Sequence, residues 1–330
     1  METVYDSLCT SISQLCAQYT GACIRPLTFG TSYLGRSIPA IQLGEGSHRL
    51  LYLGGITGDI RSSALLLRFV RDYAQAQKSG MRVAGIDISY LRHTRTITVV
   101  PLLNVDGAVL RCDGRDDNNP LTDRLRSMLP VRETDPCAEN DFSDWICSGR
   151  GVDLRCNYDF EFASAMAEAH GIGGAGFPGM HPESEPECAA VAGYLRGAAS
   201  TDLVLSFCED TDGSAPDGSI SYSGTEHRTR ALASILSRDI DGRGYECTSR
   251  SAGGSLGDWY RTLHAGPLLN ITLPADTHGT ADTQEPLYSH EHLHALLTDH
   301  CSAPGDTLAH ASLTLLYGKL RKMLFHGAVL

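Results

Sequence analysis

The sequence predicts an α/β fold built on a mostly parallel sheet that helices cover on both faces. The first observation is that apolar, β-branched stretches alternate with amphipathic stretches along the 330 residues. The second is a strand–turn–helix pattern, in which the apolar run 50–53 is followed by the glycine turn 54–60 and a helical pattern through Tyr73. The third is a set of short apolar runs typical of buried strands, at 96–100, 203–207 and 268–273.

The N-terminal third is expected to contain a helix, two short strands and the strand–turn–helix. Apolar residues recur at helical spacing over 4–20, which predicts an opening amphipathic helix. Two short strands are expected around 24–30 and 37–43, because a turn at Gly35-Arg36 separates them. A strand at 49–54 and a helix at about 61–77 follow.

The rest of the chain contains a loop-rich region and further helices. Residues 112–150 are rich in turn chemistry. Ser184-Glu185-Pro186-Glu187 predicts the start of a helix that runs through Tyr194. Helices are also expected at about 226–239 and at 307–326. Because no linker composition or internal repeat interrupts the pattern, residues 1–330 are predicted to form a single domain.

Composition excludes some classes of partner. The chain has 27 basic and 39 acidic residues, and its net charge of −12 argues against nonspecific binding to nucleic acid or to anionic membranes. The N-terminus has neither the basic start nor the apolar core of a signal peptide, so a cytoplasmic protein is expected. The 11 cysteines include no C-x-x-C pair and are expected to be reduced thiols. No pattern indicates an oligomeric state.

Six separated segments carry motifs in an order typical of one enzyme family. They are the hairpin 30–38, the glycine turn 54–60, the segments 101–107 and 145–154, the helix start 184–187, and the segment 252–259. Over about 30–260 the chain therefore resembles the zinc metallocarboxypeptidases, and in particular their bacterial γ-D-glutamyl-diaminopimelate peptidase branch. The resemblance implies a three-layer α/β/α sandwich around a mixed eight-stranded sheet.

The resemblance also implies that the zinc centre has been lost. In the family, a Gly-Gly-x-His-Gly-x-Glu turn supplies two zinc ligands, and here Thr57 holds the histidine slot and Ile60 the glutamate slot. The third ligand slot is Cys208, and Thr272 takes the place of the general-base glutamate. Zinc hydrolysis needs three protein ligands, an open coordination position and a base. We therefore expect no metal, no cofactor and no catalytic residue.

The positions that hold the substrate in the family differ as well. Arg155 and Cys156 occupy the slots of the asparagine and arginine that hold the substrate carboxylate, and the capping tyrosine falls near Ser249. A guanidinium can bind a carboxylate through two hydrogen bonds. Arg155 is thus expected either to hold a ligand carboxylate or to pair with a nearby acid, such as Asp153 or Asp159.

The leading hypothesis is a catalytically inactive carboxypeptidase-like protein whose cleft binds a peptide or a peptidoglycan stem peptide. That vestigial cleft is predicted to contain Thr57, Asp59, Ile60, Arg155, Cys156, Cys208, Ser249 and Thr272. The second hypothesis is an active peptidase or amidase with a rebuilt site, acting on γ-D-glutamyl-diaminopimelate or C-terminal peptides. The third is a structural or interaction protein with an unused cleft.

The sequence is compatible with two kinds of rebuilt site. Asp59 is either a solvated turn residue or, with Glu209, Asp210 and Asp212, part of an oxygen-rich site for a hard cation. Cys208 is either inert packing, a thiolate nucleophile beside a positive neighbour, or one half of a reversible disulfide with Cys156.

A third metal candidate lies near the C-terminus. The run 290–294 reads His-Glu-His-Leu-His and is either a metal motif or a set of surface histidines.

Overall fold

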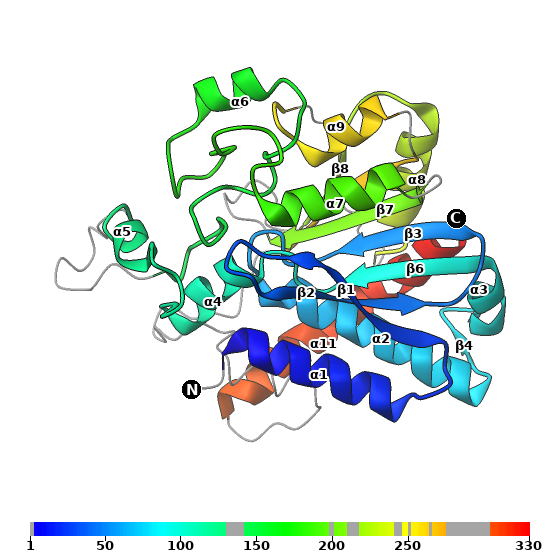
Figure 1. Ribbon diagram of the computed structural model, residues 1–330. Coiled ribbons are helices and arrows are strands. Elements are labelled where there is room, and N and C mark those ends of the chain that lie inside the picture. Colours follow the sequence, from blue (N-terminus) through cyan, green and yellow to red (C-terminus); the bar gives the residue numbers. More distant parts are fainter. Residues whose placement is uncertain are drawn as a thin grey trace.

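An eight-stranded mixed sheet lies between two layers of helices (Figure 1). The computed structural model describes residues 3–129, 142–197, 201–209, 218–240, 246–249, 252–263, 266–274 and 304–330. The predicted three-layer α/β/α sandwich with a mixed sheet is confirmed. The core is formed where apolar residues of the strands meet the inner faces of both helix layers.

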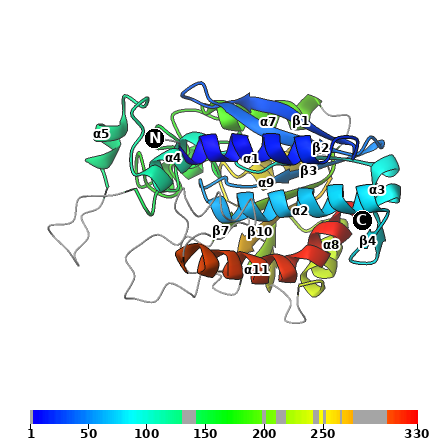
Figure 2. The same cartoon turned by 90° about the horizontal axis from the view of Figure 1, so that it is seen from below.

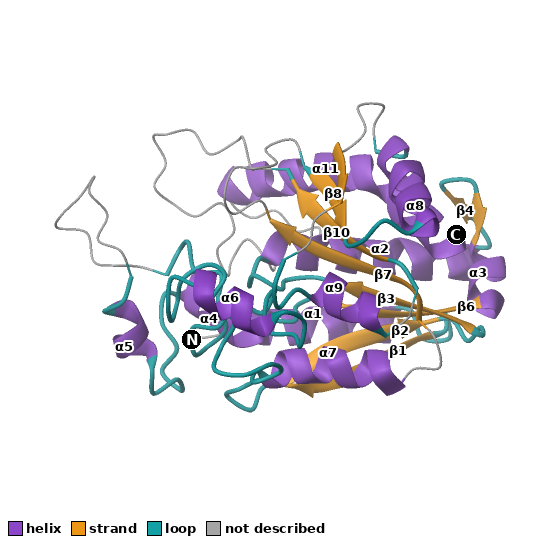
Figure 3. Cartoon of the chain, turned by 90° about the horizontal axis from the view of Figure 1, so that it is seen from above, coloured by secondary structure: helices purple, strands orange, loops and turns teal. Residues whose placement is uncertain are grey.

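The sheet is antiparallel at one edge and parallel in the middle. In spatial order its strands are β1 (Ile24–Thr31), β2 (Ser37–Leu43), β6 (Arg95–Val100), β3 (His48–Leu53), β7 (Thr201–Glu209), β10 (Leu268–Leu273), β8 (Ser219–Tyr222) and β9 (Glu246–Ser249). The pairs β6–β3, β3–β7 and β7–β10 are parallel, whereas β1–β2, β2–β6 and β10–β8 are antiparallel (Figure 3). The parallel centre therefore aligns the carboxyl ends of β3, β7 and β10.

Helices from distant parts of the chain cover the two faces. One face carries α1 (Val4–Gln18), α2 (Ile60–Ser79) and α11 (Pro304–Val329), as Figure 2 shows from below. The other face carries α7 (Pro186–Gly197) and α9 (Leu256–Thr262). The remaining elements are β4 (Arg82–Val83), β5 (Ile86–Asp87), α3 (Ile88–Thr94), α4 (Val105–Asp113), α5 (Thr122–Arg126), α6 (Phe162–Glu168) and α8 (His227–Arg238).

The strong periodic patterns gave the correct elements. The predicted opening helix, the two strands of the hairpin, the strand at 49–54, the helix at about 61–77 and the buried strands all occur within two residues or so of their expected bounds. The loop-rich region 112–150 contains the short helix α5, and its residues 130–141 lie outside the described ranges. In the described residues, no helix combines the length and the apolar character that crossing a bilayer requires.

The hairpin and the 101–107 segment meet in a buried ion network. Asp106 is fully buried and accepts hydrogen bonds from Ser32 Oγ at 2.9 Å, from the Leu34 N–H at 2.9 Å and from Arg36 Nη1 at 2.7 Å. Arg36 also donates two hydrogen bonds to Asp116, at 2.8 and 2.9 Å. Two of the six motifs therefore hold each other in place, which makes them structural.

The start of α7 carries two buried glutamates with different partners. Glu185 accepts hydrogen bonds from Ser148 Oγ at 2.9 Å and Arg150 Nε at 2.9 Å. Glu187 accepts one from the Tyr33 N–H at 3.1 Å, and its other oxygen is buried without a hydrogen-bond partner. Burial, reinforced by the charges of Asp106 and Glu185, raises the pKa of Glu187 to about 8. Glu187 is therefore mainly protonated at neutral pH.

Candidate functional site

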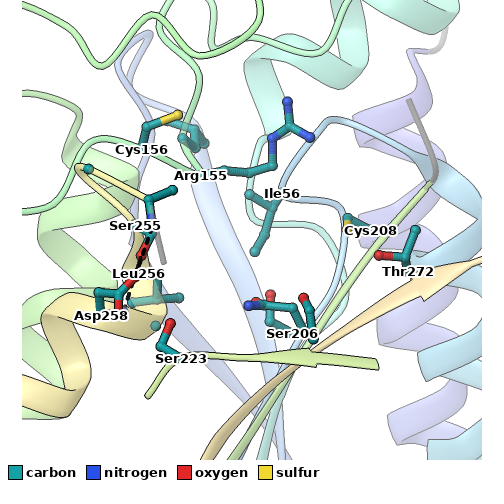
Figure 4. Close-up of a pocket in the computed structure, with 16 residues that line it drawn as sticks. Ile56, Arg155, Cys156, Ser206, Cys208, Ser223, Ser255, Leu256, Asp258 and Thr272 are labelled. Carbon is teal, nitrogen blue, oxygen red and sulfur yellow. Dashed lines mark hydrogen bonds between the residues drawn. The ribbon is translucent and has the colours of Figure 1, made fainter. Parts of the chain in front are cut away.

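A cavity of about 260 Å³ opens near the carboxyl ends of β7 and β10 (Figure 4). Four of the predicted site residues border it, namely Arg155, Cys156, Cys208 and Thr272. The rest of its lining is Ile56, Leu154, Ser206, Ser221, Ser223, Ala252, Gly253, Ser255, Leu256, Gly257, Asp258 and Asn270. Because residues from distant parts of the chain converge here, the cavity is the best candidate for a binding site.

Strand register brings the third zinc-ligand slot beside the general-base slot. Cys208 on β7 is the register partner of Thr272 on the parallel strand β10. Register partners on adjacent strands project from the same face of a sheet. The structure thus brings these two predicted positions side by side at the cavity.

One row of cavity residues was missed by the sequence reasoning. Ser206 and Asn270 are register partners on β7 and β10, and Ser221 on β8 is the register partner of Asn270 on the other side. Ser206 and Asn270 lie two residues before Cys208 and Thr272, and alternate residues of a strand share a face. That alternation was the available signal for these two residues.

Arg155 pairs with Asp153. Its Nε and Nη2 atoms donate to the two carboxylate oxygens of Asp153 at 3.0 and 2.8 Å. Burial disfavours the charged form of Asp153, but Arg155 and backbone N–H groups outweigh this effect, so the pKa of Asp153 lies below its ordinary value. Of the two roles expected for Arg155, the structure shows the salt bridge to Asp153.

The two cavity cysteines are protonated thiols. Burial raises the pKa of Cys208 to about 11, and the nearby Arg155 offsets only part of that effect. Burial also raises the pKa of Cys156 well above its ordinary range. Both cysteines are free, and Figure 4 places them on different sides of Arg155. A nucleophile needs the thiolate form, so this environment favours the inert-packing interpretation of Cys208.

The glycine turn contributes fewer lining residues to the cavity than the sequence predicted. Thr57 is fully buried and Ile60 is 3 % exposed in the hydrophobic core, and neither borders the cavity. Ile56 is the residue of this turn that reaches the cavity (Figure 4). Thr57 Oγ1 instead donates a hydrogen bond to Asp59 Oδ2 at 3.2 Å.

Asp59 caps the helix that follows the turn. Its Oδ1 accepts a hydrogen bond from the Ser62 N–H at 2.9 Å, and its side chain is almost completely buried. The interpretation of Asp59 as a solvated turn residue is therefore wrong. A carboxylate at the N-cap satisfies a free N–H of the first helical turn, and this stabilises α2.

A buried charge cluster lies beside the three ligand slots. Glu209 follows Cys208 and accepts a hydrogen bond from Arg111 Nη2 at 2.7 Å, while Arg61 Nη1 lies 3.9 Å from its other oxygen. Burial, and then the charge of Glu209, raise the pKa of Asp59 to about 6. Glu209, one of the carboxylates considered for a hard-cation site, is thus engaged by the guanidinium groups of Arg111 and Arg61.

We expect Arg111→Met to lower the free energy of unfolding by about 1–3 kcal/mol. The substitution leaves Glu209 beside the buried Asp59 with one cation fewer, and the Arg111 side chain is only 23 % exposed. Urea unfolding at pH 7 measures the loss. The double variant Arg111→Met/Glu209→Gln is the control, because it removes both charges of the pair. A loss in the double variant as large as in the single one would contradict this account.

Of the other sequence candidates, one is described by its backbone alone and the rest lie outside the described residues. The backbone of Ser249 belongs to β9, where it pairs with Tyr222 of β8. Asp210, Asp212 and the histidine run 290–294 lie outside the described residues. Within the ranges that are described, no three His, Cys, Asp or Glu side chains gather as a metal site would require.

Comparisons with known proteins point to one family. Residues 10–215 match the family profile described as zinc carboxypeptidase. The chain is 26% identical over 169 residues to gamma-D-glutamyl-L-diamino acid endopeptidase 1 of Lysinibacillus sphaericus, a match that covers 51% of this chain and 41% of that protein. The chain therefore matches less than half the length of this curated relative.

Solved structures agree on the fold. Bovine thrombin-activatable fibrinolysis inhibitor, in complex with tick carboxypeptidase inhibitor, superposes with a TM-score of 0.59 at 16% identity, covering 98% of this chain and 96% of that one. Carboxypeptidase A from Helicoverpa armigera gives a TM-score of 0.55 at 16% identity, covering 94% and 71%. A metallo-carboxypeptidase from Burkholderia cenocepacia gives 0.53 at 13% identity, covering 93% and 68%.

Proposed function

Because this chain belongs to the zinc carboxypeptidase family, we propose that it is a member without the zinc centre and without hydrolytic activity, which binds a peptide or a peptidoglycan fragment in its cavity. The observation that carries the proposal is the chemistry of the donor set at the three ligand slots. The proposal is further supported by the charge cluster around Glu209 and by Thr272 in the general-base position.

The side chains at the ligand slots do not fit a zinc ion. Zinc is held by deprotonated thiolates, neutral histidines or carboxylates, and a catalytic site has three of them. Thr57 offers a buried hydroxyl that donates to Asp59, and Ile60 offers no donor atom. Cys208 is the one metal-binding type among the three, and a single protein ligand is fewer than the three that a catalytic zinc site has.

The surroundings also disfavour a divalent cation. Arg111 and Arg61 place two positive charges beside Glu209, the residue next to Cys208. These guanidinium groups engage the carboxylate that a cation would otherwise use as a ligand. Thr272 stands in the general-base position, and a hydroxyl cannot accept a proton from water near neutral pH.

The proposed ligand follows from the family and from the retained cavity. The curated relative is named a gamma-D-glutamyl-L-diamino acid endopeptidase. The bacterial branch that the sequence resembles acts on stem peptides of peptidoglycan. The cavity in this chain keeps a mixture of apolar, hydroxyl and amide groups around Arg155. A small peptide is the class of ligand that such a lining and the family resemblance support together.

The metal part of the proposal is tested by elemental analysis of the purified protein after dialysis. We expect a zinc-to-protein molar ratio well below one, and no release of amino acid from γ-D-glutamyl-L-lysine with or without added zinc. Zinc retained at one equivalent would contradict the proposal. Turnover that Cys208→Ala or Asp59→Ala abolishes would instead support an active enzyme with a rebuilt site.

A further inference from the structure

The floor of the cavity is an uncharged polar row that crosses three strands. Asn270 on β10 is flanked by its register partners, Ser206 on β7 and Ser221 on β8. All three border the cavity, and Figure 4 shows Ser206 at its floor. Their side chains therefore lie next to one another on the face of the sheet that a bound ligand would meet.

This row has unused hydrogen-bonding capacity. Ser206 is 3 % exposed and Ser221 is 9 % exposed, so both are more than nine-tenths buried. Among the described residues, neither hydroxyl and neither atom of the Asn270 amide has a hydrogen-bond partner in the protein. Their side chains border the cavity, so a ligand that enters it can replace water as their hydrogen-bond partner. The three side chains are thus available to hydrogen-bond a ligand in the cavity.

The charged groups around the cavity are already neutralised within the protein. Arg155 is paired with Asp153 through two hydrogen bonds. Asp258 accepts hydrogen bonds from Ser255 Oγ at 2.8 Å and from the Ala252 N–H at 3.1 Å, and its other oxygen lies 3.6 Å from Arg261. A charged group at the polar row would lose its hydration without gaining an opposite charge there.

We propose that the row Ser206–Asn270–Ser221 recognises a neutral group that both donates and accepts hydrogen bonds, with a side-chain carboxamide as the matching chemistry. The amide of Asn270 presents one acceptor and two donors, and each serine hydroxyl can act in either sense. A carboxamide pairs with such a set, whereas an alkyl group leaves it unsatisfied. The inference rests on the proposed binding role of this cavity and narrows its ligand class.

The test compares three γ-D-glutamyl dipeptides of similar shape by calorimetry. They end in L-glutamine, L-glutamate or L-norleucine, which differ at the end of one side chain. We expect the glutamine peptide to bind about 10-fold more tightly than the other two, because each neutral hydrogen bond contributes roughly 0.5–1.5 kcal/mol, or about 2- to 13-fold. Asn270→Leu should abolish this preference, because it weakens binding of the glutamine peptide and does not weaken binding of the norleucine peptide.

A second variant separates recognition from a structural role. Ser206→Ala removes a hydroxyl without a partner, so we expect about threefold weaker binding of the glutamine peptide together with an unchanged or raised melting temperature. Ser11→Ala is the matched control, since Ser11 is also buried, its hydroxyl also has no hydrogen-bond partner, and it lies in α1. That control should leave the affinities of all three peptides unchanged.

The outcomes separate this inference from the proposed function. Equal affinity for the three peptides, or a glutamine preference that survives Asn270→Leu, would overturn the carboxamide inference and leave peptide binding standing. Absence of binding for all three peptides would overturn both. A preference for glutamate or norleucine would also reject the inference, because it would require a charged or apolar complement that the row does not offer.

Discussion

Replacing Arg36 with methionine is expected to lower the free energy of unfolding by about 3–5 kcal/mol. Arg36 is 13 % exposed, and its two carboxylate partners, Asp106 and Asp116, are 0 % and 2 % exposed. Removing the guanidinium leaves two buried carboxylates without the cation that they share. Such an uncompensated charge is among the few single changes that destabilise a protein this strongly. Urea unfolding at pH 7 measures the effect.

The matched control is Arg115→Met. Arg115 also pairs with an aspartate, Asp117, but their side chains are 70 % and 72 % exposed. An exposed pair contributes roughly 0–1 kcal/mol, so this variant should be nearly as stable as the wild type. If both variants lost a similar amount of unfolding free energy, burial would not be the reason that the Arg36 network stabilises the protein.

The stability gained by Glu187→Gln is expected to grow with pH. Burial raises the pKa of Glu187 from an ordinary value of 4.5 to about 8. Below pH 4.5 both the folded and the unfolded chain hold the proton, so this carboxyl group does not make the free energy of unfolding depend on pH. Between pH 4.5 and 8 the unfolded chain releases the proton and the folded chain keeps it, so the wild type loses stability as pH rises. Above pH 8 both states are ionised and the loss levels off.

The expected size of this difference is on the order of 3–5 kcal/mol, since one pKa unit corresponds to ~1.4 kcal/mol. Urea unfolding of both proteins at pH 4.5, 6, 7.5 and 9 measures it. Glutamine keeps an oxygen for the Tyr33 N–H, so the two proteins should be similar at pH 4.5. Glu168→Gln, at an exposed position, is the control and should show no such trend. A difference that is constant across pH would mean that Glu187 is not held protonated.

The elements with strong periodicity were predictable from the sequence because they use local signals. The strand, glycine turn and helix around 50–79 combine an apolar run, glycines and helical spacing within thirty residues or so. The strands β8 and β9 were missed because each has only four residues, with serines among the apolar positions. Their place in the sheet comes from pairing with distant strands, and that pairing leaves no local signal.

Family resemblance and strand alternation were the only sequence signals for the site residues. Resemblance placed Cys208 and Thr272 at one location, and the structure makes them register partners. The pairing of Glu209 with Arg111 joins residues 98 positions apart in the sequence, and charge alone does not choose that partner. Ser221 faces Asn270 through an antiparallel register that the sequence does not encode locally.

The burial of the glycine turn restricts the side chains that positions 57 and 60 can accept. Thr57 is fully enclosed and Ile60 is packed in the core, so a histidine or a glutamate at either position would now displace apolar neighbours or lose its hydration. Each of these single substitutions would therefore lower the stability of the protein. A metal site at this turn would therefore require several residues to change together.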